Sequence, residues 1–306
     1  MAVRKPGRAA LVTLAAAVTL AGSSQAQLAD RMKPGVALET GYSVTPDIVY
    51  ETANNYEARL DVYRPHATEG RAPTLIYIHG GGWVEGRKEA ELPRLMPYLS
   101  AGWAVVNVEY RLADVSLAPA AVEDCRCALQ WIRRHAEEYG FDTTRVVVTG
   151  HSAGGHLSLT TGMLPASAGL DRQCNGTADM PVAAIVNWYG ITDVADLLDG
   201  PNQKSYAVQW LSSMPDRNAV AERVSPLTYV RAGLPPIITI HGDADGVVPY
   251  GHAVRLHRAL DAAGVPNRLV TIPGGGHGGF STAEYERAYA EIGAFLQQYV
   301  VGTGGS

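Results

Sequence analysis

A glycine-rich turn at residues 150–155, Gly-His-Ser-Ala-Gly-Gly, lies between a strand pattern and a helix pattern. Residues 145–149 form a β-branched run typical of a buried parallel strand, and residues 156–163 keep the apolar spacing of a helix. In this context the glycines allow a sharp turn that lifts the serine hydroxyl clear of the sheet. The pattern predicts that Ser152 is a nucleophile, and the alternative is an ordinary turn with a serine cap.

The rest of the chain alternates strand patterns with helix patterns. We expect strands at residues 47–52, 56–63, 74–78, 103–109, 145–149, 182–188, 236–240 and 267–272. We expect helices at residues 92–100, 118–139, 156–163, 206–211, 251–263 and 283–299. This order predicts an α/β fold with a doubly wound, mostly parallel sheet and helices on both faces. The first two strands alternate in polarity, which predicts a half-exposed antiparallel pair.

Residues 1–26 have the composition of a secretory signal peptide. Basic residues precede an apolar run at residues 9–22, and small residues then follow at the spacing of a cleavage site. The run is too short and too rich in alanine for a membrane span, and no cysteine follows it to accept a lipid. We therefore expect residues 27–306 to form a single exported domain, either periplasmic or secreted.

The charge balance is acidic and limits the expected partners. The chain has 25 Lys and Arg residues against 30 Asp and Glu residues, which gives a formal net charge of −5. Loss of the basic leader would make the mature chain more acidic still. We therefore expect no nucleic-acid partner and no anionic membrane surface as a partner.

A second glycine-rich segment, His79-Gly80-Gly81-Gly82-Trp83, follows the predicted strand at residues 74–78. Three successive glycines leave backbone N–H groups bare at the end of a central strand. Such groups can point at a developing oxyanion, where one donor contributes about 2.7 to 4 kcal/mol of transition-state stabilisation. A flexible solvent loop is the alternative, but such a loop has no need of a tryptophan.

Two later loops carry carboxylate and imidazole groups. Asp243 and Asp245 directly follow one predicted strand, and His277 follows the last one. Each lies just past the carboxyl end of its strand, where open parallel sheets hold their active sites. A serine hydroxyl is a weak nucleophile, so it needs an imidazole to take its proton and a carboxylate to orient that imidazole. His277 and one of the two aspartates fit these roles.

Together these motifs resemble those of the α/β-hydrolase fold serine esterases. The resemblance is strongest to the secreted carboxylesterase branch linked to feruloyl and acetyl-xylan ester cleavage, with the hormone-sensitive-lipase-like esterases close by. It covers residues 45–300 and rests on four motifs in the same order, namely residues 79–83, 150–155, 241–249 and the glycine-flanked His277. It implies an α/β-hydrolase fold. The apolar pattern becomes patchy at about residues 193–234, which we interpret as a small cap insertion over the site.

The resemblance also implies roles for individual residues. Ser152 would be the nucleophile and His277 the base. Asp245 would be the acid, because its spacing to Val248-Pro249 is the element that the family keeps, and Asp243 is the alternative. The oxyanion hole would use the backbone N–H groups of Gly81, Gly82 and Ala153.

Two features depart from the lipase-like relatives. Those proteins commonly carry a helical cap at the N-terminus. In this chain the pattern of the mature residues before His79 predicts mainly strands. The segment at residues 193–234 is then the remaining cover, so we expect a fairly open site. His151 stands where hormone-sensitive-lipase relatives usually have an acidic residue, and we interpret it as structural or as pocket lining.

The expected reaction is hydrolysis of esters of short-chain or aromatic acids, on small molecules or on polysaccharides. Trp83, Trp188 and Tyr189 are candidate substrate contacts, and core packing is the alternative for both tryptophans. The chain lacks the H-E-x-x-H spacing of zinc hydrolases and the Lys-Ser/Thr of a phosphate loop, so we expect no metal and no cofactor. The alternative functions are a peptidase or amidase, including one similar to kynurenine formamidase, and a catalytically inactive binding module.

The three cysteines allow at most one disulfide. Cys174 lies in a polar loop, whereas Cys125 and Cys127 lie two residues apart on one predicted helix and face different directions. Thiols of exported proteins tend to pair. We therefore predict a bridge from Cys174 to Cys125 or Cys127, and the alternative is three buried thiols.

Overall fold

The computed structural model describes residues 1, 41–66, 70–174 and 181–302. The chain divides into two units, Met1–Tyr42 and Ser43–Ser306. Apart from Met1, the predicted signal peptide at residues 1–26 lies outside the described residues. All the structure reported below belongs to the second unit, apart from the first residue of its first strand.

Within the described residues, eight strands form one sheet in the order β1-β2-β4-β3-β5-β6-β7-β8. The strands are β1 (Tyr42–Ala53), β2 (Tyr56–Pro65), β3 (Ala72–Ile78), β4 (Ala104–Val108), β5 (Phe141–His151), β6 (Ala184–Trp188), β7 (Ile237–Gly242) and β8 (Asn267–Ile272). The strands from β4 to β8 in this order pair in parallel, and β2 pairs with β4 in antiparallel fashion. The predicted doubly wound, mostly parallel sheet is confirmed.

The first two strands, which were predicted to pair with each other, are neighbours in the sheet and form a hairpin. Asn54 and Asn55 connect β1 to β2, and both have positive φ angles, 53° and 62°. Two residues of positive φ form the type of turn whose twist matches that of paired strands, and asparagine is among the residues that tolerate it.

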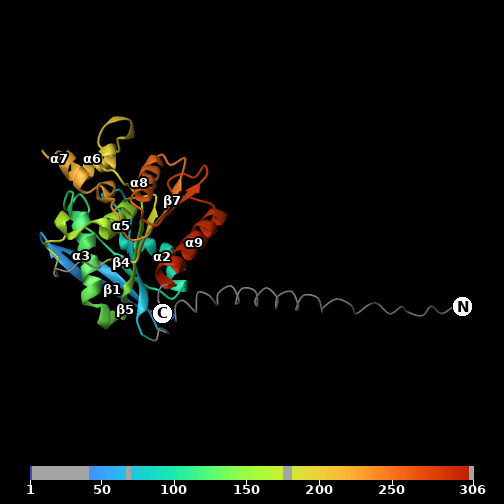
Figure 1. Cartoon of the computed structure of the whole chain (residues 1–306). Coiled ribbons are helices and arrows are strands. Elements are labelled where there is room, and N and C mark those ends of the chain that lie inside the picture. Colours follow the sequence, from blue (N-terminus) through green and yellow to red (C-terminus); the bar gives the residue numbers. More distant parts are fainter. Residues whose placement is uncertain (2–40, 67–69, 175–180, 303–306) are drawn as a thin grey trace. The chain divides into compact units, whose positions relative to one another are not determined.

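Helices cover both faces of the sheet (Figure 1). They are α2 (Leu92–Ser100), α3 (Ala120–Arg134), α4 (Ala136–Tyr139), α5 (Ala153–Met163), α6 (Ser205–Leu211), α7 (Arg217–Arg223), α8 (Gly251–Ala262) and α9 (Thr282–Leu296). Tyr98 of α2 contacts Tyr289 of α9, so these two helices share one face. On the other face α3 packs against α5. None of the helices in the described ranges has the length and apolar character needed to cross a bilayer.

The predicted helix at residues 118–139 is divided in two. It breaks at His135, which caps α3 and precedes α4. The His135 ring stacks on Trp131, and both its backbone N–H and its Nδ1 lie within hydrogen-bond distance of the Trp131 carbonyl oxygen. At the break, the backbone N–H and the ring nitrogen of His135 therefore share the Trp131 carbonyl oxygen as an acceptor. Apolar spacing alone does not predict a break at this residue.

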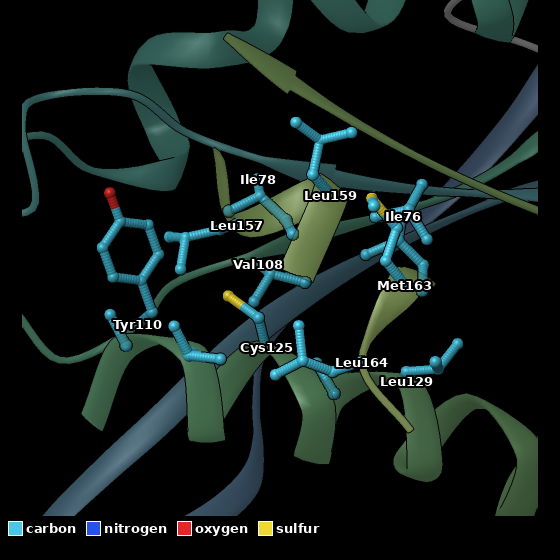
Figure 2. Packing of buried hydrophobic residues seen from close by; sticks show 14 of the residues in the cluster. Ile76, Ile78, Val108, Tyr110, Cys125, Leu129, Leu157, Leu159, Met163 and Leu164 are labelled. Atoms are coloured by element: carbon cyan, nitrogen blue, oxygen red, sulfur yellow. The ribbon is translucent and has the colours of Figure 1, made fainter. Parts of the chain in front are cut away.

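Helix α5 lies in the centre of the core and has almost no exposed face. Figure 2 shows Leu157 and Met163 of α5 among side chains from β3 and α3, including Ile76 and Leu129. Two hydroxyl groups on the helix donate to carbonyls of the helix itself, Ser158 to Gly154 at 2.7 Å and Thr160 to Leu157 at 3.1 Å. A helix packed in this way is a rigid base for the turn that precedes it.

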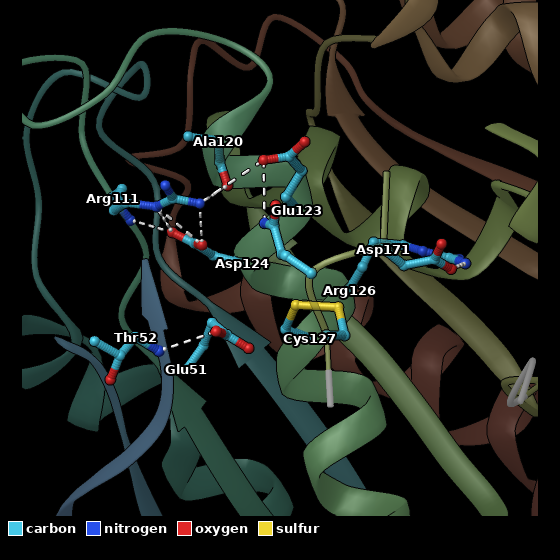
Figure 3. The surroundings of a disulfide bond; sticks show 11 residues. Glu51, Thr52, Arg111, Ala120, Glu123, Asp124, Arg126, Cys127 and Asp171 are labelled. Atoms are coloured by element: carbon cyan, nitrogen blue, oxygen red, sulfur yellow. Dashed lines mark hydrogen bonds and ion pairs between the residues drawn. A yellow bond between two sulfur atoms is a disulfide. The ribbon is translucent and has the colours of Figure 1, made fainter. Parts of the chain in front are cut away.

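The disulfide joins Cys127 to Cys174, and Cys125 is a buried free thiol. The prediction of one bridge from Cys174 is therefore confirmed, with Cys127 as the partner. Cys125 points into the core beside the sheet (Figure 2), whereas Cys127 lies near the ion pair between Arg126 and Asp171 (Figure 3). The bridge ties α3 to the loop that follows α5.

Loss of this bridge should destabilise the protein. The two cysteines are 47 residues apart, and closing a loop of that length stabilises the folded state by about 4 kcal/mol in the chain-entropy description. We expect Cys174→Ser to lower the free energy of unfolding by several kcal/mol, measured by urea titration. Dithiothreitol should destabilise the wild type and the Cys125→Ala control but not Cys174→Ser. An equal effect of the reductant on all three proteins would contradict the pairing.

Candidate functional site

Ser152 lies in a tight turn between β5 and α5. Its backbone has φ 55° and ψ −120°, a strained conformation for a residue with a side chain. A Cβ atom at Gly150 or at Gly154 would collide with the Ile78 carbonyl oxygen at the end of β3. Glycine at both positions therefore lets the turn approach β3 closely, and Ser152 takes the strain at the tip.

The structure brings together the three side chains that the sequence picked out. His277 Nε2 lies 2.8 Å from Ser152 Oγ, and His277 Nδ1 lies 2.7 Å from Asp245 Oδ2. Asp243 is exposed and lies outside this chain of hydrogen bonds, because its carboxylate accepts from the backbone N–H of Gly274. The expected choice of Asp245 over Asp243 as the partner of His277 thus agrees with the geometry.

The Asp245 carboxylate is held by several donors. Oδ1 accepts from the backbone N–H groups of Val247 and Val248, at 2.8 and 2.9 Å. Oδ2 accepts from His277 and lies 3.2 Å from Nε2 of the fully buried His241. Burial alone would raise the pKa of Asp245, but hydrogen bonds from His241 and His277 outweigh it and hold this pKa well below its ordinary value. Asp245 therefore stays ionised beside His277.

The glycine loop after β3 supplies free backbone donors. Gly81 and Gly82 have φ angles of 109° and 58°, and a Cβ at Gly81 would collide with the Glu85 carbonyl. Over the described ranges, no backbone carbonyl accepts from the N–H groups of Gly81, Gly82 or Ala153. Ala153 begins α5, where the first N–H groups have no partner within the helix.

Two adjacent cavities lie at the site, and Ser152 lines the first of them. The first, which we call the Ser152 cavity, has a volume of about 340 Å³ and is lined by residues that include Gly81, Gly82, Ser152, Tyr206 and His277. Tyr206 belongs to α6, so the segment expected to cover the site does contribute to its wall. Its hydroxyl donates to the Val247 carbonyl at 3.1 Å, which joins α6 to the Asp245 loop.

The second cavity, which we call the aromatic cavity, has a volume of about 360 Å³. Trp188 and Tyr189, two of the candidate substrate contacts, line it. It also contains Tyr77, Tyr285 and Tyr289, which the sequence analysis missed. The two α9 tyrosines are four residues apart and so share one helix face, but that spacing does not distinguish a cavity wall from core packing.

The expectation that Trp83 contacts substrate is corrected. Its side chain is fully buried and lines neither cavity. The indole stacks on Trp210 with ring centroids 4.2 Å apart, and its Nε1–H donates to His156 Nδ1 at 3.2 Å. Trp83 therefore anchors the glycine loop in the core, between α5 and α6.

No cluster of three or more potential metal ligands is found among the described residues. The chemistry that the site offers is that of a serine hydroxyl, an imidazole and a carboxylate in hydrogen-bonded series beside free backbone donors.

Comparison with known proteins agrees with this arrangement. The BD-FAE family model matches residues 60–260, which is more than half of the chain. The chain belongs to the BD-FAE family. The matched residues include Ser152 and Asp245 but end before His277, so the contact of His277 with the other two is a finding of the structure.

Curated relatives of this BD-FAE chain include mycobacterial esterases. The chain is 30% identical to esterase LipQ of Mycobacterium tuberculosis, over 72% of this chain and 53% of LipQ. It is 31% identical to esterase LipC of the same organism, over 72% of this chain and 56% of LipC. The chain therefore spans about half the length of these curated relatives.

Solved structures similar to this BD-FAE chain are also esterases. Esterase 2 of Thermogutta terrifontis superposes with a TM-score of 0.71 at 26% identity, covering 87% of this chain and 95% of that one. A truncated carbohydrate esterase from gut microbiota superposes with a TM-score of 0.68 at 27% identity, covering 83% and 97%. Both support the α/β-hydrolase fold over nearly the whole length of the compared chains.

The support beneath the glycine loop depends on a neutral histidine. His156 is fully buried, accepts from Trp83 at Nδ1 and donates from Nε2 to the Val224 carbonyl at 2.8 Å. Protonation of Nδ1 would turn this acceptor into a donor that faces the indole N–H of Trp83 and would break their hydrogen bond. Burial lowers the pKa of His156 to about 4, despite its hydrogen bond to Val224.

This histidine should make stability dependent on pH. Between about pH 6.5 and 4 the unfolded state takes up a proton at this residue and the folded state does not, so stability falls as the pH falls. Over this range we expect the free energy of unfolding of His156→Gln to fall by about 3 kcal/mol less than that of the wild type. Urea titrations at a series of pH values measure it. The control Val254→Gln, at an exposed position on α8 that carries no titratable group, should keep the wild-type dependence. An unchanged dependence in His156→Gln would contradict the assignment.

Proposed function

We propose that this chain is a serine carboxylesterase that acts through an acyl-enzyme on esters of short-chain or aromatic acids. The observation that carries the proposal is the series of hydrogen bonds from Ser152 through His277 to Asp245. Membership of the BD-FAE family and similarity to named esterases give it independent support. An inactive binding module has no need of this arrangement beside a cavity.

Each group has a defined part in the reaction. His277 Nε2 takes the proton of Ser152 as Oγ attacks the ester carbonyl, and the ionised Asp245 stabilises the imidazolium that forms. The tetrahedral oxyanion accepts hydrogen bonds from backbone N–H groups of Gly81, Gly82 and Ala153. His277 then donates its proton to the leaving alcohol, and a water molecule activated by His277 hydrolyses the acyl-enzyme.

The size and lining of the cavities support small acyl groups. Volumes of about 340 and 360 Å³ lie near the lower end of the range for small-molecule sites. Structures of Thermogutta terrifontis esterase 2 were solved with propionate and with butyrate bound, and another neighbour is a carbohydrate esterase. We therefore propose short or aromatic acyl groups on small alcohols or on polysaccharides.

We also propose that the protein acts outside the cytoplasm. The composition of residues 1–26 supports export, and the Cys127–Cys174 disulfide supports an oxidising compartment. Detection of the mature chain in the periplasm or the medium, shortened near Gln27, would test this part of the proposal.

A panel of p-nitrophenyl esters from acetate to palmitate, run with methyl ferulate, acetylated xylan and a peptide p-nitroanilide, tests the proposed activity. We expect kcat/KM to be highest for acetate or butyrate and poor for palmitate, because the cavities have small volumes, and the anilide to be nearly inert. A preference for palmitate would contradict the short-acyl proposal. Efficient anilide cleavage would favour a peptidase or amidase.

Three variants connect that activity to the site. Ser152→Ala should lower kcat by about 10⁴-fold or more, since the remaining groups cannot form the acyl-enzyme. Asp245→Asn should cost about 10⁴-fold, because the amide favours the wrong tautomer of His277. Asp243→Asn is the matched control and should have a mild effect. A larger loss in Asp243→Asn than in Asp245→Asn would overturn the assignment of the acid.

A further inference from the structure

The aromatic cavity and the Ser152 cavity share three lining residues, Arg94, His151 and Tyr189. The aromatic cavity is therefore adjacent to the cavity that Ser152 lines. His277 lines the Ser152 cavity but not the aromatic cavity. Since His277 must reach the oxygen of the leaving alcohol, the alcohol belongs on the His277 side and the acyl group on the side of the aromatic cavity.

Arg94 is the one side chain with a full positive charge among the residues that line the two cavities. His151 lines both as well, but burial lowers its pKa to about 3, so it is neutral at physiological pH. Glu85 lines the Ser152 cavity alone and opposes an anion there. Arg94 is also paired with Glu91, which lines neither cavity, so Arg94 is the group of the lining that can bind an anion on the acyl side.

The guanidinium of Arg94 has N–H donors that remain available to a ligand. Its Nη1 donates to Glu91 Oε2 at 3.2 Å, and the Tyr189 hydroxyl interacts with it electrostatically. A guanidinium carries five N–H donors in a planar fork that matches a carboxylate, and two neighbours do not use all of them. The side chain is 41% exposed, which leaves it accessible to a ligand.

The side chains next to Arg94 are fixed by hydrogen bonds to one another. The Tyr77 hydroxyl lies 3.2 Å from Glu91 Oε2 and 3.1 Å from His151 Nδ1. Glu91 is buried, with a side chain only 7% exposed, so its ion pair with Arg94 fixes the guanidinium beside the aromatic rings that line the cavity. A flat ring that fits between those walls can direct a substituent at Arg94.

We propose that the aromatic cavity is a subsite for an aromatic acyl group whose ring carries a carboxylate, and that Arg94 binds the carboxylate. The inference rests on the proposed esterase function and extends it to the charge of the acyl group. Substrates of this class are half-esters of aromatic dicarboxylic acids. The rings of Trp188, Tyr189 and Tyr289 contact the aromatic ring, and Arg94 selects the charged substituent.

A pair of matched esters tests the subsite. Methyl 4-carboxybenzoate is anionic, and methyl 4-carbamoylbenzoate has nearly the same shape without the charge. We expect the ratio of their kcat/KM values, anionic over neutral, to fall about tenfold or more in Arg94→Gln. Arg94→Lys keeps the positive charge but loses the planar pair of N–H donors, so its ratio should lie between those of the wild type and Arg94→Gln. The control Arg133→Gln, at an exposed position on α3, should keep the wild-type ratio.

A binding measurement gives a readout that does not depend on turnover. Methyl 4-carboxybenzoate should quench part of the tryptophan fluorescence of Ser152→Ala protein, because Trp188 lines the cavity, and its Kd should rise about tenfold or more when Arg94→Gln is added. An equal ester ratio and an equal Kd with and without Arg94 would overturn the subsite. Absence of p-nitrophenyl acetate hydrolysis by the wild type would instead overturn the proposed function, so the two failures are distinguishable.

Discussion

The structure depends on how closely the turn after β5 approaches the end of β3. Glycine at positions 150 and 154 removes the side chains that would collide with the Ile78 carbonyl. The chain can then turn within a few residues, and Ser152 takes a conformation that costs energy for a residue with a Cβ. The buried helix α5 and the surrounding core supply the stability that keeps this strain in place.

The second requirement is that distant parts of the chain meet at one edge of the sheet. Strands β3, β5, β7 and β8 are parallel, so the loops after them emerge at the same edge although they lie far apart in sequence. Asp245 and His277 are delivered by the last two of these strands. The backbone N–H groups and His241 that surround Asp245 keep it ionised, and an ionised carboxylate orients the imidazole toward Ser152.

The sequence carries much of this arrangement because it follows from local rules. Strand and helix periods predict the sheet, and the order of the loops predicts which side chains meet there. The direction in which an individual side chain points could not be predicted from the sequence. Trp83 was expected in the cavity but packs in the core, because its indole finds Trp210 and His156 there. The choice between Cys125 and Cys127 likewise depends on how α3 rotates against the sheet, which composition does not determine.

The central claim is that Ser152 is a nucleophile activated by its neighbours, and covalent labelling tests it most directly. A fluorophosphonate probe reacts with an activated serine hydroxyl without the need to know the substrate. We expect one equivalent of probe to attach to the wild type, with peptide mapping that places it on Ser152, and labelling to slow sharply in His277→Ala. Failure of the folded wild type to label, or labelling at another residue, would contradict the account.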